Sequence, residues 1–174
     1  GRAAGDQNAA MSAMEQSFGD AADTIKAFAD TSVRAVGLSK TAALEATTSF
    51  AGIARQMQLT GESAAQFAIE QTKLAADLAA FKNVSPEQAI QDLTAAFSGS
   101  TEVMQKYQVN LNDAILKQTL FKETGEKVTG TLTPQQKALA INLALIEQTA
   151  TMQGQWNREL ASNESKSAMF AASL

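Results

Sequence analysis

Apolar residues recur at intervals of three and four along most of the chain, which is the spacing of one face of an α-helix. The clearest stripe, within residues 62–81, consists of Phe67, Leu74, Leu78 and Phe81. Comparable patterns predict further helices over residues 11–36 (with a break at Gly19), 41–60, 86–99, 113–124 and 134–160. We therefore expect an all-α fold, an array or bundle of about six to seven short-to-medium amphipathic helices separated by capped breaks.

Two prolines mark the starts of helices. They lie in the stretches SPEQ, residues 85–88, and TPQQ, residues 133–136. In each stretch the Ser or Thr side chain can cap the helix, and the proline at the first helical position has no N–H to leave unpaired. The glutamine three residues after the cap can complete a capping box. A third cap is predicted at Asn112, and helix ends are predicted at Gly99 and Gly125.

The two ends of the chain are expected to differ. Residues 1–10 are small and polar, so they offer little apolar surface and are predicted to form a flexible N-terminal segment. Residues 11–174 are predicted to form a single all-α helical region and, because the chain opens with Gly1, to be a fragment of a longer protein. The helix that begins at Pro134 is expected to be the longest. Its buried stripe is predicted to consist of Leu139, Leu143, Ile146, Trp156 and Leu160.

Composition narrows the classes of function. The net charge of −4 and the pI of about 4.9 argue against a nucleic-acid groove, which needs clustered Lys and Arg. The chain has no Cys and no His, which removes disulfides, thiolate chemistry, imidazole bases and the usual transition-metal ligands. Its most apolar run, residues 138–146, is far shorter than the ~18 residues of a membrane span. We expect a soluble segment with no membrane span.

Two Glu-Ser pairs are the best candidates for catalysis. Glu62 and Glu164 each sit in a pair that resembles the start of a lytic transglycosylase motif, where a glutamate is the general acid in glycosidic cleavage. The aromatic and glycine context of a sugar cleft is missing around both. We expect Glu62 to complete the first helical turn after Thr60 and Glu164 to be solvated. The prediction is that the segment is not an enzyme and has no catalytic, cofactor-binding or metal-binding residue.

Three aspartates and two aromatic residues have alternative interpretations. Asp20, Asp23 and Asp30 could be drawn as a cation site, but calcium loops need about six oxygen ligands around a glycine turn. A solvated helix face is the preferred interpretation. Tyr107 and Trp156 could line a groove that faces a partner, yet their helical spacing with neighbouring apolar residues favours core positions.

Four stretches carry a resemblance to a known family. They are GLSKTAALEATTSFAGIARQ (37–56), LTGESAAQFA (59–68), LAADLAAFKNVSPEQAIQDLTAAFSGSTEVMQKYQVNLNDAILK (74–117) and GTLTPQQKALAINLALIEQTATMQGQWNRELAS (130–162). In this order they resemble the conserved region of tape measure proteins, the long minor tail proteins of siphophages and related prophages. Members often have GETEPLRKFG where this chain has GSTEVMQKYQ, and QGDFART where it has QGQWNRE. A proline and several charges therefore differ, while Trp156 stands where the family has another aromatic residue, phenylalanine.

The resemblance implies a structural role in a phage tail. Such a protein would set tail length by spanning the lumen of the tail tube during assembly, and would leave with the genome at ejection. Implied partners are other copies of itself (a trimer or hexamer), the tail tube protein, tail assembly chaperones and tail tip proteins. Implied locations are the virion tail lumen and, during assembly, the host cytoplasm. Because its predicted helices are short and capped, we expect this segment to be a folded part of the larger ruler.

Two alternative functions come from the same family. Some tape measure proteins include peptidoglycan-degrading domains, so a lytic transglycosylase-like module stays open as an alternative. A membrane-active module is the other, because these proteins are thought to help form a conduit into the host. The family assigns no catalytic residue to the matching stretches, so none is carried over.

Overall fold

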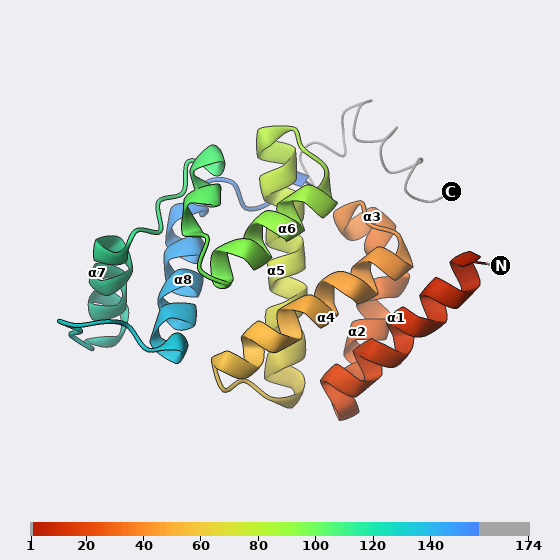
Figure 1. The fold of residues 1–174 in the computed structure, drawn as a ribbon. Coiled ribbons are helices and arrows are strands. Elements are labelled where there is room, and N and C mark those ends of the chain that lie inside the picture. Colours follow the sequence, from red (N-terminus) through yellow and green to blue (C-terminus); the bar gives the residue numbers. More distant parts are fainter. Residues whose placement is uncertain (1, 157–174) are drawn as a thin grey trace.

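The computed structural model describes residues 2–156, which form eight α-helices and two 3₁₀-helices and contain no strand (Figure 1). The expectation of an all-α array is confirmed. In chain order the elements are α1 (Arg2–Phe18), the 3₁₀-helix η1 (Gly19–Ala21), α2 (Ala22–Asp30), α3 (Ser32–Val36), α4 (Lys40–Gln56), α5 (Gly61–Lys82), α6 (Pro86–Phe97), the 3₁₀-helix η2 (Thr101–Tyr107), α7 (Asp113–Thr124) and α8 (Pro134–Gln148).

Helix α5 is the centre of the array. Helices α1 and α2 lie on one side of it, the antiparallel pair α7 and α8 lies on the other, and α4 and α6 cross it (Figure 1). Its buried face is rich in alanine, whose small side chain lets neighbouring helices approach closely. Phe67 of α5 meets Phe97 of α6 edge to face, with ring centroids 6.0 Å apart. The predicted stripe on α5 is buried through Leu78, whereas Phe81 is 38% exposed.

The predicted caps of α6 and α8 are present. Ser85 Oγ accepts the N–H of Gln88 at 3.1 Å, and Thr133 Oγ1 accepts the N–H of Gln136 at 3.1 Å. Gln136 Oε1 in turn accepts the N–H of Thr133 at 2.9 Å, so the capping box of α8 is confirmed. Gln88 differs from the prediction, because its side-chain amide donates to Asp92 Oδ1 at 3.1 Å. The Asp92 carboxylate one turn ahead accepts a charge-assisted hydrogen bond from this amide, which turns the side chain away from the Ser85 N–H that its carbonyl oxygen would accept in a capping box.

The start of α1 corrects the expectation for the N-terminus. Residues 2–10, expected to be flexible, are helical, and Ala10 is buried in the core together with Met14 and Phe18. These residues include four alanines, the strongest helix former. Extending a helix that is already packed adds one hydrogen bond for each residue fixed, so the helix continues back to Arg2.

The end of α8 corrects the expectation for the C-terminus. The helix stops at Gln148, residues 149–154 form turns, and the longest described helix is α5 with 22 residues. Leu160 lies outside the described residues. The buried stripe predicted for the helix that begins at Pro134 is also wrong. Leu139 and Leu143 are half-buried and Ile146 is 52% exposed.

The buried face of α8 is an alternative apolar face of the same helix. It consists of Ala138, Ala140, Ile141, Ala144 and Leu145. The helix packs mainly against α7. The short alanine side chains let this face of α8 pack closely against the rest of the fold. The bulkier Leu139 and Leu143 are left half-buried.

Candidate functional site

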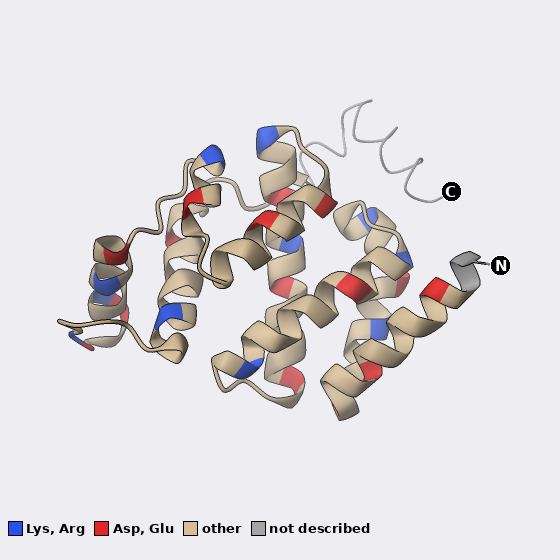
Figure 2. Ribbon diagram, in the orientation of Figure 1, with Lys and Arg blue, Asp and Glu red and all other residues tan. Residues whose placement is uncertain are grey.

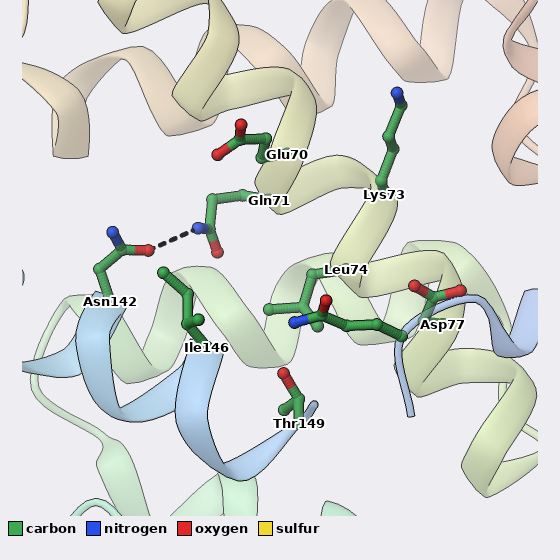
Figure 3. Close-up of a pocket in the computed structure, with 9 residues that line it drawn as sticks. Glu70, Gln71, Lys73, Leu74, Asp77, Asn142, Ile146 and Thr149 are labelled. Carbon is green, nitrogen blue, oxygen red and sulfur yellow. Dashed lines mark hydrogen bonds between the residues drawn. The ribbon is translucent and has the colours of Figure 1, made fainter. Parts of the chain in front are cut away.

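A hollow of about 360 Å³ lies between α5 and α8 (Figure 3). Its α5 wall is formed by Glu70, Gln71, Lys73, Leu74 and Asp77, and its other wall is formed by Asn142, Ile146, Thr149 and Gln153. The two helices come within hydrogen-bonding distance at one point, where Gln71 Nε2 donates to Asn142 Oδ1 at 2.9 Å. The hollow is thus an opening between two helices that are joined by one amide pair.

The amide pair leaves one strong acceptor unused. Gln71 is 4% exposed, and its carbonyl oxygen Oε1 is buried without a hydrogen-bond donor among the described residues. In Figure 3 this oxygen points between Leu74 and Ile146. Burying an unpaired carbonyl costs about 1–3 kcal/mol, so this amide pair is a costly contact between the two helices.

A second hollow, of about 430 Å³, continues the first along α5. Its lining residues are Met57, Leu59, Glu62, Ser63, Gln66, Phe67, Glu70 and Asn142. The two hollows share Glu70 and Asn142. We call the combined feature the α5–α8 groove. Three carboxylates (Glu62, Glu70 and Asp77) and one ammonium (Lys73) line it, which gives the groove a net charge of −2.

Glu62 lies in the first turn of α5, as predicted. Its carboxylate accepts the hydroxyl of Thr24 at 2.7 Å and the side-chain amide of Gln66 at 3.2 Å. The nearest groove carboxylate along the helix is that of Glu70, eight residues or about 12 Å away along the axis. Glycosidases that use two carboxylates hold them about 5–9.5 Å apart, so Glu62 and Glu70 are not spaced as such a pair. Glu164 lies outside the described residues.

The aspartates of the possible cation site are dispersed. Asp20 is in η1, Asp23 lies 3.8 Å from Lys26, and Asp30 forms an ion pair with Lys40 at 3.0 Å. Within residues 2–156 no group of three or more acidic side chains is placed to hold a metal ion. All three aspartates are exposed, as a solvated helix face requires.

Tyr107 is fully buried and forms a short hydrogen bond to a buried carboxylate. Its hydroxyl donates to Asp92 Oδ2 at 2.6 Å, and Lys106 Nζ lies 3.1 Å from the same oxygen. Burial would raise the pKa of Asp92, but hydrogen bonds from Tyr107, Lys106 and Gln88 outweigh it, so this pKa is lowered. Burial and the neighbouring Asp92 carboxylate raise the pKa of Tyr107. At neutral pH the Asp92 side chain is therefore a carboxylate and the Tyr107 side chain a neutral phenol. Neither group is poised to exchange a proton near pH 7, which indicates that the network is structural.

Sequence reasoning missed Asp92, although one signal was present. Asp92 lies three residues after Ala89 and four before Ala96, so it occupies the apolar face of α6. A carboxylate on a buried face requires a buried partner. Its donor comes from η2, fifteen residues along the chain, and no local pattern identifies that residue.

Trp156 is also a core residue, and it lies far from the stripe predicted for it. Its indole Nε1 donates to the carbonyl of Arg34 at 3.1 Å, and its ring packs against Gly37. The backbone N–H groups of Gly154 and Trp156 donate to the two carboxylate oxygens of Asp77, at 3.0 and 2.9 Å. We call this set of contacts the Trp156 anchor. Tyr107 and Trp156 are both buried, so their predicted core positions are confirmed.

The described surface has mixed charge. Basic and acidic residues are interspersed over the array, and the described part of the chain shows no continuous basic stripe (Figure 2). No helix between residues 2 and 156 combines the length and the apolar character needed to cross a membrane.

Comparisons with known proteins found no relative. No protein-family model, curated protein or solved structure matches the chain. The resemblance to tape measure proteins therefore depends on the four sequence stretches alone.

Proposed function

We propose that this chain is a folded helical segment of a phage tail tape measure protein, with a structural and non-catalytic role in tail assembly. The observation that carries the proposal is the ordered set of four resembling stretches. Their distinctive residues have structural roles here: SPEQ starts α6, TPQQ starts α8, and QGQW, residues 153–156, forms part of the Trp156 anchor. Residues used for capping and packing support a structural role better than a catalytic one.

The proposed partners and location follow the same resemblance. They are other copies of this chain, the tail tube protein, tail assembly chaperones and tail tip proteins, in the tail lumen and in the host cytoplasm during assembly. The fold bears on how such a segment would contribute to length. As one continuous helix, residues 2–156 would extend about 230 Å at 1.5 Å for each of 155 residues. The chain instead reverses direction repeatedly, so a folded segment adds much less.

The test is an in-frame duplication of residues 2–156 in the phage or prophage that encodes the chain. Purified virions are analysed by mass spectrometry for this protein, and tails are measured by electron microscopy. We expect the protein in the virion and a tail-length change well below ~230 Å. Absence of the protein from virions would contradict the tail assignment, and lengthening by about 230 Å would contradict the folded state.

The non-catalytic part of the proposal has its own assay. A peptidoglycan zymogram of the purified chain is expected to show no clearing. Clearing that disappears in Glu62→Gln or Glu164→Gln, with the other variant still active, would establish the lytic alternative and identify its glutamate.

A further inference from the structure

Helix α8 carries an apolar face that the fold leaves half covered. Leu139, Asn142, Leu143 and Ile146 follow the i, i+3, i+4, i+7 spacing of a face that packs against another helix. The leucines are half-buried and Ile146 is 52% exposed, whereas Ala138, Ala140 and Ala144 of the same helix are buried. Asn142 and Ile146 also line the α5–α8 groove. The uncovered face and the groove are therefore one continuous surface.

We propose that the α5–α8 groove is the docking site for an amphipathic helix of a partner protein, one that carries Arg or Lys beside its apolar residues. The inference stands independently of the tail assignment, because it uses only the groove itself. Binding of an amphipathic helix through its apolar face in a groove between helices is a common mode of recognition.

The dimensions and apolar lining of the groove fit a helix. From Glu62 to Asp77 it follows 15 residues of α5, about 22 Å, which is the length of a helix of four turns. The apolar residues of its lining are Met57, Leu59, Phe67, Leu74 and Ile146. Phe67 and Leu74 are already buried, so a docked helix would cover the exposed parts of Met57, Leu59 and Ile146 together with the leucine face of α8.

Charge selects a basic helix. The groove has a net charge of −2, and Glu70 is exposed and makes no ion pair with any residue of the described range 2–156. An Arg from the partner could lay its aliphatic stem on the exposed Ile146, and its guanidinium would be attracted by the Glu70 carboxylate. An acidic helix would be repelled by Glu70.

The test uses a fluorescein-labelled 16-residue helical peptide as the probe. It has Leu at i, i+3, i+4 and i+7 repeats and Arg at the flanking positions, and a second peptide has Glu in place of every Arg. Fluorescence anisotropy with the whole chain is expected to give saturable binding of the Arg peptide. The Glu peptide is expected to bind at least tenfold more weakly.

Matched variants separate the groove from the rest of the surface. Ile146→Ser is expected to weaken binding about tenfold, whereas Phe121→Ser, at a 54% exposed position of α7 outside the groove, leaves it unchanged. Glu70→Lys is expected to abolish binding, whereas Glu45→Lys makes the same charge change at an exposed position of α4 outside the groove and retains it. These side chains are exposed, so far-ultraviolet circular dichroism should show native helix content in all four variants.

Three results would overturn the proposal. One is equal affinity for the Arg and Glu peptides, and another is equal weakening by the groove variants and by their controls. The third is concentration-dependent self-association that Ile146→Ser abolishes and Phe121→Ser does not, because it would assign the groove to a second copy of this chain.

Discussion

Replacing Tyr107 with phenylalanine removes one hydroxyl from the interior, and the structure sets the size of the effect. The hydroxyl donates to the Asp92 carboxylate at 2.6 Å, and the tyrosine is fully buried. A hydrogen bond to a charged acceptor contributes about 1.5–3 kcal/mol. Lys106 and Gln88 still hold Asp92 in the variant. We expect Tyr107→Phe to lower the free energy of unfolding at pH 7 by about 2 kcal/mol, and Tm by roughly 4–8 °C for a chain of this size.

The pH dependence of the effect identifies its cause. Because the pKa of Asp92 is lowered in the folded state, its stabilisation is present above the unfolded pKa and is lost as the pH falls through the folded value. The difference between the wild type and Tyr107→Phe should therefore shrink in acid. Because the pKa of Tyr107 is raised, the wild type should lose stability as the pH rises above about 10, and the variant should lack this loss.

The assay is urea unfolding followed by circular dichroism at a series of pH values from about 3 to 11. The reasoning is refuted if the two proteins differ by less than about 0.5 kcal/mol at pH 7. It is also refuted if a difference exists but stays constant across the acid range, since the lost contact would then not involve the Asp92 carboxylate.

Two further substitutions, Gly37→Ala and Thr133→Ala, test the Trp156 anchor and the caps, and each has a matched control. At Gly37, φ is +72° and an added Cβ would lie 2.5 Å from the Trp156 ring, so Gly37→Ala should cost at least about 2 kcal/mol and shift the tryptophan emission to longer wavelength. Gly130→Ala, whose added carbon meets nothing within 4 Å, should change stability by less than about 0.5 kcal/mol, and equal effects would contradict this account. Thr133→Ala should cost about 1 kcal/mol in thermal unfolding because it removes a capping hydrogen bond. Thr60→Ala should cost less, because Thr60 makes no side-chain capping bond, and the reverse order would refute the assignment of the caps.

The starts of several helices could be predicted because their signals are local. Ser85 and Thr133 cap helices that begin with proline, and Asn112 caps α7 by accepting the N–H of Ile115 at 2.8 Å. Each of these contacts lies within three residues, so the sequence contains both partners side by side. The position of Glu62 in the first turn of α5 follows from the same kind of signal.

The features that were missed depend on contacts between distant segments. Helix α8 has two apolar faces, and the choice of the alanine face over Ile146 depends on the packing of α7, which periodicity does not specify. Trp156 was placed on a continued helix, whereas its indole bonds to Arg34, 122 residues earlier. The α5–α8 groove was not predicted for the same reason, since Gln71 and Asn142 are 71 residues apart.

The Trp156 anchor determines where tension on the chain would be borne. The carboxylate of Asp77 accepts two backbone N–H groups, those of Gly154 and Trp156, and Asp77 belongs to the central helix α5. A pulling force applied beyond Trp156 is consequently transmitted first to the middle of the array and, through the Arg34 carbonyl, to the α3 region. Helix α8 would be loaded only after these bonds rupture, so it is mechanically shielded even though it precedes the anchor by a few residues.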